Sequence, residues 1–384
     1  MRFIASFLLL ACAIPGVAQK LSSVPNPSGP GSIQPNWSVM PDGALILSWI
    51  EPAKDDSLSL RYAIRRGEKW SEARTIIAKR PFFHHPAEAP EVVAVNDRVL
   101  LAHWIETEEG SEAEFLYVSA STDGVKWSTP SMAHKDKSKV QHGLASMVVS
   151  GPNEASILWL FTPMGEDGPA YLMRSVVDAA GKFVKEERLD SDVCTCCPTS
   201  VAKTPKGLLV AYRDHTPADI RDIAVTRFEN AKWTPPKIIS PDNWKIEGCP
   251  INAASVAARG NRAMVAWYTG VGGSPKVQAA FSNDGGVTFG KPVLISTGHA
   301  FGYASAALID DNTGVISWLE RNAKGGARVL LRQVSAAGTV GPVVQAAEGG
   351  QQTLGYPRTV SSAAGTFIAW NGGEGKLQTA KIDK

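Results

Sequence analysis

The feature that most constrains this chain is an internal repeat of 51 to 55 residues. In each of seven units, an aromatic residue ends a short apolar run that is continuous or alternating, such as Leu45–Trp49. Runs of this kind are typical of β-strands, because an amphipathic helix needs apolar residues three and four positions apart. The seven aromatic residues are Trp49, Trp104, Trp159, Tyr212, Trp267, Trp318 and Trp370. A fixed period of this length indicates a repeat architecture.

Each unit has room for four short strands, which is the size of a propeller blade. We therefore predict an all-β fold over residues 34–384, a seven-bladed β-propeller of four-stranded antiparallel blades, with the repeated aromatic residues in its core. The last unit ends at its third strand, so residues 19–33 are expected to act as a linker and to supply the closing strand. A six-bladed, sialidase-like ring is the alternative if one terminal unit does not close.

The N-terminus has the pattern of a secretory signal. Arg2 precedes an apolar run that ends in small residues near Ala18, and the run is too short to span a bilayer as a helix. We expect residues 1–18 to be removed and the protein to be periplasmic or secreted. A second hypothesis stays open, because the residues around Cys12 resemble a lipobox, in which this cysteine would carry a lipid anchor.

Composition excludes two classes of protein. Lys and Arg number 39 against 37 Asp and Glu, which gives a net charge of +2, whereas a protein that binds nucleic acid carries a basic surface. The chain is 44% hydrophobic, which does not fit a disordered polypeptide. We expect a folded monomer that binds no nucleic acid.

Two turns carry a resemblance to a known family. Residues 282–289 read S-N-D-G-G-V-T-F, and residues 121–127 read S-T-D-G-V-K-W, one residue shorter. Both resemble the Asp-box of sialidase-like (BNR-repeat) β-propellers, and the repeat extends this resemblance over residues 34–384. Aspartate and glycine are turn-forming residues, so the motif serves folding, and the fold itself hosts many functions.

The resemblance implies a glycan ligand at the mouth of the central channel. Sialidases use an arginine triad, a tyrosine nucleophile and an aspartate acid/base. The matching candidates here are Asp214 and Tyr356 as catalytic residues, with Arg213, Arg221 and Arg358 binding the substrate. The early R-I-P motif of sialidases is missing, so two roles stay open, an exo-glycosidase and a non-catalytic binder of acidic sugars.

Four cysteines remain beyond the signal segment. Three of them form the stretch Cys194-Thr-Cys196-Cys197 before the first strand of the fourth unit, and Cys249 precedes the fifth unit. In a propeller the first strands begin near the axis on one face, so these positions and His142 of the third unit are expected to meet there.

Three hypotheses follow for the cysteines. The first is a pair of structural disulfides, one from Cys249 to the triplet and one within the triplet, which would make the protein a braced scaffold. The second is a Cu or Zn site, and the third is a redox site. The metal hypothesis takes as ligands Cys194, Cys196, Cys197, Cys249 and His142.

Overall fold

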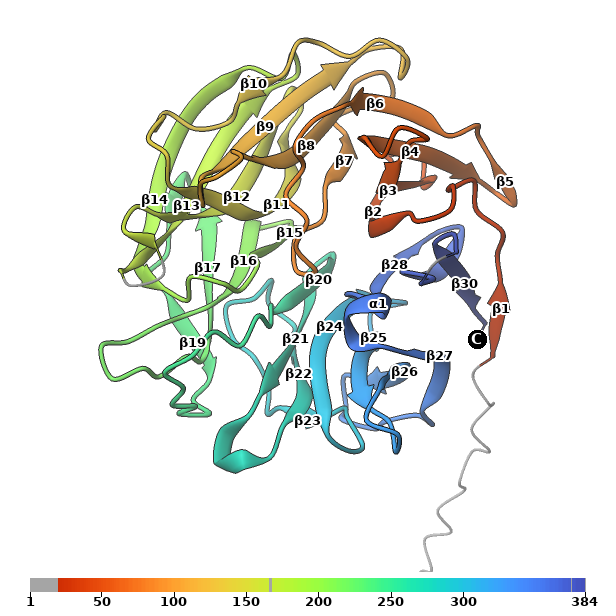
Figure 1. Ribbon diagram of the computed structural model, residues 1–384. Helices are drawn as coiled ribbons and strands as arrows, with labels where there is room; N and C mark the ends of the chain where they lie inside the picture. Colours follow the sequence, from red (N-terminus) through yellow and green to blue (C-terminus); the bar gives the residue numbers. More distant parts are fainter. Residues whose placement is uncertain (1–19, 166–167, 374, 384) are drawn as a thin grey trace, which may run out of the picture.

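The computed structural model describes residues 20–165, 168–373 and 375–383, and the predicted signal segment with Cys12 lies outside them. The chain forms seven antiparallel sheets arranged as a ring (Figure 1). The predicted seven-bladed β-propeller is therefore confirmed, and the six-bladed alternative is wrong. No helix within the described residues is long and apolar enough to cross a bilayer.

The first four blades follow one another along the chain. Blade 1 consists of β2 (Ile33–Val39), β3 (Leu45–Pro52), β4 (Leu58–Arg66), β5 (Lys69–Trp70) and β6 (Arg74–Ala78). Blade 2 consists of β7 (Glu91–Ala94), β8 (Leu100–Thr107), β9 (Glu114–Ser121) and β10 (Ser131–Met132). Blade 3 consists of β11 (Gln141–Gly151), β12 (Glu154–Thr162), β13 (Ala170–Asp178) and β14 (Phe183–Val193). Blade 4 consists of β15 (Ser200–Thr204), β16 (Gly207–Arg213), β17 (Ile223–Glu229), β18 (Lys232–Trp233) and β19 (Lys237–Ser240).

The remaining blades complete the ring. Blade 5 consists of β20 (Ser255–Arg259), β21 (Arg262–Thr269), β22 (Lys276–Ser282) and β23 (Val293–Leu294), with the short helix η2 (Val271–Gly273) between its middle strands. Blade 6 consists of β24 (Ala300–Leu308), β25 (Thr313–Arg321), β26 (Ala327–Ser335) and β27 (Val344–Gly349), followed by helix α1 (Gln351–Leu354). Blade 7 consists of β28 (Arg358–Ser362), β29 (Gly365–Trp370), β30 (Gln378–Ile382) and, from the other end of the chain, β1 (Leu21–Ser23).

The outermost strands of blades 1, 4 and 7 differ from those of the other blades. In blades 1 and 4 the fourth strand is divided, so that β5 and β6 both pair with β4, and β18 and β19 both pair with β17. In blade 7 the N-terminal β1 pairs antiparallel with the C-terminal β30, with Leu21 opposite Ile382 (Figure 1). The two ends of the chain thus share one sheet, which ties the ring closed.

The core lies between blades, and the repeated aromatic residues form its centre. All seven are buried, six of them with at most 1% of their surface exposed. Each buried polar atom needs a partner. Trp49 and Trp104 donate their indole N–H groups to glutamates two residues along, Glu51 and Glu106, at 2.8 and 2.7 Å. The predicted core role of these residues is confirmed.

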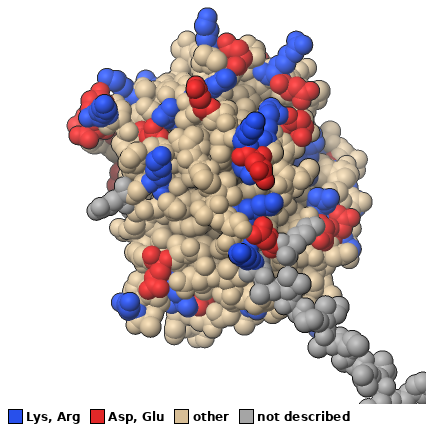
Figure 2. All heavy atoms as spheres, turned by 90° about the vertical axis from the view of Figure 1, so that its right-hand side faces the viewer, with Lys and Arg blue, Asp and Glu red and all other residues tan. Residues whose placement is uncertain are grey.

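The two turns that resemble an Asp-box are held by their own side chains. Asp284 accepts hydrogen bonds from the backbone and hydroxyl of Thr288 at 3.0 and 2.7 Å, and Asp123 accepts from the backbone N–H of Lys126 at 2.7 Å. On the side of the molecule shown in Figure 2, positive and negative side chains are interspersed.

Candidate functional site

The first strands of the blades begin at one end of the channel, and their leading residues are in direct contact. The N–H of Asn252 donates to Sγ of Cys197 at 3.3 Å, and Oδ1 of Asn252 accepts from the N–H of Tyr303 at 2.8 Å. The rings of Tyr303 and Tyr356 stack with centroids 3.9 Å apart. The prediction that these repeat positions meet near the axis is confirmed for blades 4 to 7. We call this end of the channel the axial face.

The backbone at the axial face adopts a conformation that side chains rarely take. Gln34, Leu144, Ile251 and Tyr303 have φ angles of 54°, 56°, 48° and 56°. This left-handed region is costly for residues other than glycine, and most costly for a β-branched residue such as Ile251. The same conformation recurs where the first strands of four blades begin. Strain of this kind is concentrated at functional sites.

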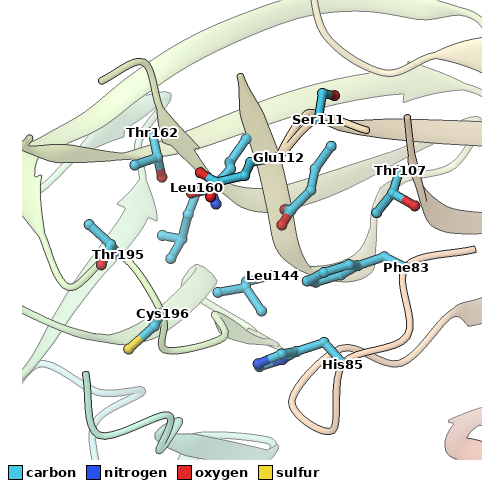
Figure 3. Close-up of a pocket in the computed structure, with 13 residues that line it drawn as sticks. Phe83, His85, Thr107, Ser111, Glu112, Leu144, Leu160, Thr162, Thr195 and Cys196 are labelled. Carbon is cyan, nitrogen blue, oxygen red and sulfur yellow. The ribbon is translucent and has the colours of Figure 1, made fainter. Parts of the chain in front are cut away.

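Two cavities open at the axial face. The first cavity, of about 310 Å³, lies at blades 2, 3 and 4 (Figure 3). The stacked rings of Phe83 and His85, with centroids 5.3 Å apart, lie on one side of it, and Thr195 and Cys196 lie on the opposite side. Its other lining residues include Glu112, Glu114, Gln141, Gly143, Leu144, Leu160 and Thr162.

The second cavity, of about 480 Å³, lies at blades 1, 2 and 7. Glu88, Tyr356 and Arg358 are on its wall, and His84 contributes from the loop before β7. Arg358 also lines the central channel, a space of about 160 Å³ bordered by residues of all seven blades. Arg358 therefore borders both the second cavity and the channel.

Glu114, the first residue of β9, is the notable acid of the first cavity. Its side chain is 8% exposed, and no hydrogen-bond partner for its carboxyl is found among the described residues. Burial alone raises the pKa of Glu114 to about 7, because the charged form loses its hydration. A large fraction of this carboxyl therefore holds a proton at neutral pH, as a general acid requires.

Glu88 is the corresponding acid of the second cavity. It is 3% exposed, its Oε2 accepts from the N–H of Ala145 at 3.1 Å, and its Oε1 is buried without a partner. Burial raises the pKa of Glu88 to about 8, and the nearby Glu114 adds to the shift. Two neutral carboxyls on adjoining cavities are a feature of sites that transfer protons.

Neither of these glutamates was predicted from the sequence. A signal was present for Glu88, which lies two residues before Pro90 at the repeat position where a first strand begins. For Glu114 the signal was weaker, because only the tertiary structure shows that its carboxyl lies on the wall of a cavity at the axial face.

The three predicted substrate-binding arginines have different surroundings. Arg213 is 1% exposed, and its guanidinium donates to the carbonyls of Asn252 and Tyr268 at 3.1 and 2.8 Å and of Arg221 at 2.7 Å. Arg221 contacts the cysteines, and its Nη1 lies 3.2 Å from Sγ of Cys194. Of the three, only Arg358 lines a cavity, and its Nε is buried without a hydrogen-bond partner. The structure therefore provides one arginine facing a cavity in place of the expected triad.

The predicted catalytic residues, Asp214 and Tyr356, do not line a common cavity. The hydroxyl of Tyr356 donates to the carbonyl of Ile251, and burial raises the pKa of this phenol well above its usual range, so it is a poor nucleophile. Asp214 lies between β16 and β17. Burial and the carboxylate of Asp190 raise the pKa of Asp214 to about 7, but it lines neither cavity. The geometry favours Glu114 and Glu88 over this pair.

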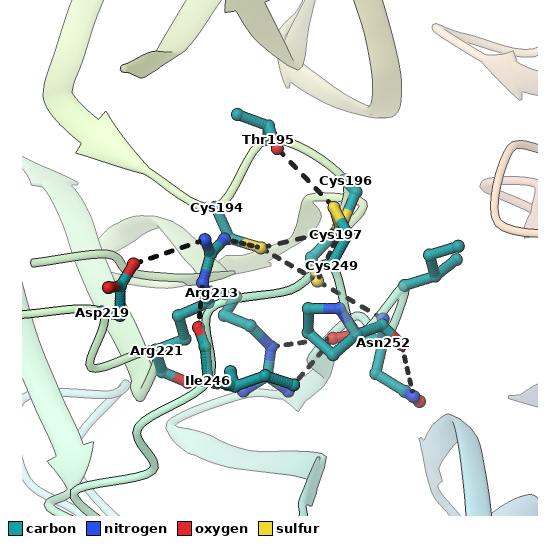
Figure 4. The surroundings of a disulfide bond; sticks show 12 residues. Cys194, Thr195, Cys196, Cys197, Arg213, Asp219, Arg221, Ile246, Cys249 and Asn252 are labelled. Atoms are coloured by element: carbon teal, nitrogen blue, oxygen red, sulfur yellow. Dashed lines mark hydrogen bonds and ion pairs between the residues drawn. A yellow bond between two sulfur atoms is a disulfide. The ribbon is translucent and has the colours of Figure 1, made fainter. Parts of the chain in front are cut away.

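The cysteines form one disulfide, between Cys196 and Cys249, with Cα atoms 6.0 Å apart (Figure 4). The predicted link from Cys249 to the triplet is confirmed. The prediction of a second disulfide, within the triplet, is wrong. Cys194 and Cys197 are free and buried, and their sulfur atoms lie 3.4 Å apart. Their mutual hydrogen bond lowers the pKa of Cys194, with help from Arg213 and Arg221, and burial raises that of Cys197.

The predicted five-ligand metal set is not assembled. The disulfide occupies two of its sulfurs, and His142 lies elsewhere, with Nδ1 2.8 Å from the carbonyl oxygen of Glu114 and its ring stacked on His134 at 4.1 Å. Within the described part of the chain, the group of potential ligands close enough to share an ion consists of Cys194, Cys196 and Cys197. Two free thiols remain.

No protein-family model and no curated protein matches this chain. Among solved structures, an ulvan lyase of polysaccharide lyase family 25, bound to a GlcA–Rha3S unit, superposes with a TM-score of 0.57 at 9% identity, covering 94% of this chain and 96% of that one. The α-L-arabinofuranosidase of Fusarium graminearum in complex with arabinobiose gives 0.51 at 11% identity, covering 96% and 98%. A sialidase described as Hadza microbial sialidase Hz136 gives 0.44 at 15% identity, covering 75% of this chain and 63% of its own length. For the ulvan lyase and the arabinofuranosidase, the likeness at these identities shows a shared fold.

Proposed function

We propose that this protein binds and cleaves an acidic oligosaccharide at the axial face, with Glu114 as the proton donor. The observation that carries the proposal is a buried carboxyl without a hydrogen-bond partner on the wall of a cavity, its pKa raised to about 7. Cleavage of a glycosidic bond needs an acid that is still protonated near neutral pH, together with a second carboxylate. Glu112 on the same wall is the candidate for the second group.

The preference for an acidic sugar rests on Arg358. Two carboxyls interact with its guanidinium, those of Glu88 and Glu91, and Glu88 has a pKa raised to about 8 and is largely uncharged at neutral pH, so it does not neutralise the guanidinium. Glu91, the other neighbouring carboxylate, accepts a hydrogen bond from the N–H of Met147 at 2.9 Å. The guanidinium of Arg358 borders both the second cavity and the channel, which suits a substrate carboxylate.

The structural neighbours support the same class of function. Two propellers of this fold with TM-scores above 0.5 are described as an ulvan lyase and an arabinofuranosidase, both of which act on glycans. The first was solved with a unit that contains GlcA, a sugar acid. Because fold alone does not fix function, the test must come from the residues of the cavities.

The experiment uses three defined probes: a fluorogenic sialoside, an aryl α-L-arabinofuranoside and a set of oligosaccharides that contain a uronic acid. Product release and binding heat are measured for the wild type, Glu114→Gln, Arg358→Gln and the control Glu109→Gln, which alters an exposed carboxyl that lines neither cavity. We expect Glu114→Gln to lower kcat by at least about 100-fold with little change in KM. A loss of this size in kcat is the usual effect of removing a general acid. Arg358→Gln should weaken binding of the acidic probe and leave the neutral one unchanged. The proposal fails if no probe is bound or cleaved, or if Glu114→Gln retains full turnover.

We also propose that the protein is exported. The Cys196–Cys249 disulfide supports this, because such bonds persist in oxidising compartments. Mass spectrometry of the protein from the periplasmic fraction is expected to find a mature N-terminus at residue 19. A chain that begins with a lipidated Cys12 in the membrane fraction would support the lipoprotein hypothesis in its place.

A further inference from the structure

The cysteine cluster has an exposed half and a buried half. The disulfide partner Cys249 is exposed and Cys196 is half-buried, whereas Cys194 and Cys197 are each 1% exposed. The sulfur of Cys194 lies 3.8 Å from that of Cys196 and 3.4 Å from that of Cys197 (Figure 4). A buried thiol pair is thus in van der Waals contact with a solvent-accessible disulfide.

We propose that these four cysteines form a thiol–disulfide relay, in which the disulfide moves between the outer pair, Cys196–Cys249, and the inner pair, Cys194–Cys197. The inference does not depend on the proposed glycan function. Its ligands are thiols and disulfides of small molecules, and its contact point with solvent is Cys249.

Exchange takes two steps, each an attack of a thiolate on a disulfide sulfur. The Cys194 thiolate attacks Sγ of Cys196, so the 194–196 bond forms, the 196–249 bond breaks, and Cys249 leaves as a thiolate that takes up a proton. The Cys197 thiolate then attacks Sγ of Cys194, so the 194–197 bond forms and Cys196 leaves and is protonated. One disulfide and two thiols are present before and after, so the exchange needs no external oxidant.

The exchanged form connects the buried pair to solvent. Its outer thiols, Cys196 and Cys249, can reduce one external disulfide to two thiols, which restores the 196–249 bond. Both cysteine pairs are then oxidised, and the two electrons given to the external disulfide have come from Cys194 and Cys197. Since Cys196 and Thr195 also line the first cavity, the exchange takes place at its wall.

The surroundings suit this chemistry. Nη1 of Arg221 lies 3.2 Å from Sγ of Cys194, and the same side chain is fixed by a hydrogen bond of 3.1 Å from its Nε to the carbonyl of Ile246. A guanidinium at this distance stabilises the attacking thiolate. The N–H of Asn252 points at Sγ of Cys197 at 3.3 Å, and the hydroxyl of Thr195 lies 3.7 Å from Sγ of Cys249, the first leaving group.

The test incubates the full chain with oxidised glutathione, quenches it with acid, alkylates free thiols and maps the disulfides by mass spectrometry. In the wild type we expect a Cys194–Cys197 bond to appear with release of two molecules of reduced glutathione per chain. Cys197→Ser blocks the second step, so a Cys194–Cys196 bond is expected, with the released Cys249 recovered as its mixed disulfide with glutathione. Cys249→Ser removes the contact point and should slow oxidation of the inner pair at least 10-fold.

Arg221→Gln and the control Arg227→Gln, on the same blade but paired with Glu229, separate electrostatics from folding. The first should slow exchange about 10-fold, and the second should leave it unchanged. Circular dichroism checks that each variant is folded. The relay is overturned if Cys197→Ser keeps only the Cys196–Cys249 bond, if Cys249→Ser oxidises at the wild-type rate, or if Cys194 and Cys197 are purified holding stoichiometric copper or zinc.

Discussion

The carboxylate of Glu114 occupies the space that a side chain at position 143 would need. A Cβ on Gly143 would collide with Oε2 of Glu114, and Gly143 lies on the same cavity wall. The glycine thus permits the placement of the acid, and the two residues come from strands of different blades, β11 and β9.

Substitution of Gly143 by alanine tests this relationship. We expect Gly143→Ala to lower the free energy of unfolding by about 1–3 kcal/mol, the usual cost of overpacking, and to displace the acid from the cavity. Thermal unfolding measures the loss. The control is Gly248→Ala, where a Cβ meets no atom within 4 Å and no such loss is expected. In the double variant with Glu114→Ala the loss should shrink, and an undiminished loss would contradict the contact.

The raised pKa of Glu114 predicts a pH dependence of stability. The pKa rises from 4.5 to about 7 on folding, so the folded chain binds more protons than the unfolded one between these values. The stabilisation is complete below pH 4.5 and is lost as the pH rises through 7. Glu114→Gln should therefore reduce the fall in unfolding free energy between pH 5 and pH 8 by up to about 3 kcal/mol. Urea unfolding at both pH values gives the numbers, and Glu112→Gln, which alters an exposed carboxyl, should match the wild type.

The burial of Arg213 predicts a structural role. Arg213→Met leaves the carbonyls of Asn252 and Tyr268 without their donor and removes a stacking contact with Trp244. We expect a loss of at least about 2 kcal/mol in unfolding free energy, because several hydrogen bonds from a charged group disappear. Arg259→Met, which alters an exposed arginine paired with Asp311, should change stability by less than about 0.5 kcal/mol. Equal effects in the two variants would show that Arg213 does not support the fold.

The disulfide predicts a second stability difference. Cys196 and Cys249 are 53 residues apart in sequence, and loss of a link of this kind costs about 2–4 kcal/mol. Cys249→Ser and Cys196→Ser should lower the thermal midpoint by similar amounts, and a reducing agent should lower that of the wild type alone. A reducing agent that leaves the wild type unchanged would contradict a stabilising outer disulfide.

Closure of blade 7 by β1 predicts an effect of truncation. A chain that starts at residue 25 loses three residue pairs with β30 and the hydrogen bond of 2.9 Å from the N–H of Val24 to the carbonyl of Thr379. We expect its urea midpoint to fall below that of a chain that starts at residue 20, because the edge of β30 is left unpaired. Equal midpoints would show that the ring does not need this strand.

The fold and the position of the axial face could be predicted from the residues alone. The repeat of 51–55 residues is a local pattern present in every unit, and burial of one aromatic residue per unit requires neighbouring blades on both sides. The contact of Cys197 with Asn252, and of Tyr303 with Tyr356, follows from the same period, because equivalent positions in a closed ring lie at equal distances from its axis.

The chemistry of that face could not be predicted and depends on how the blades pack together. The sequence could not show that Cys196 rather than a neighbour pairs with Cys249, that Arg213 gives its donors to backbone carbonyls, or that Glu114 is buried beside Gly143. Each depends on where a side chain from one blade meets a loop from another. Such contacts lie far apart in sequence and differ from blade to blade, so the repeat that specifies the ring carries no information about them.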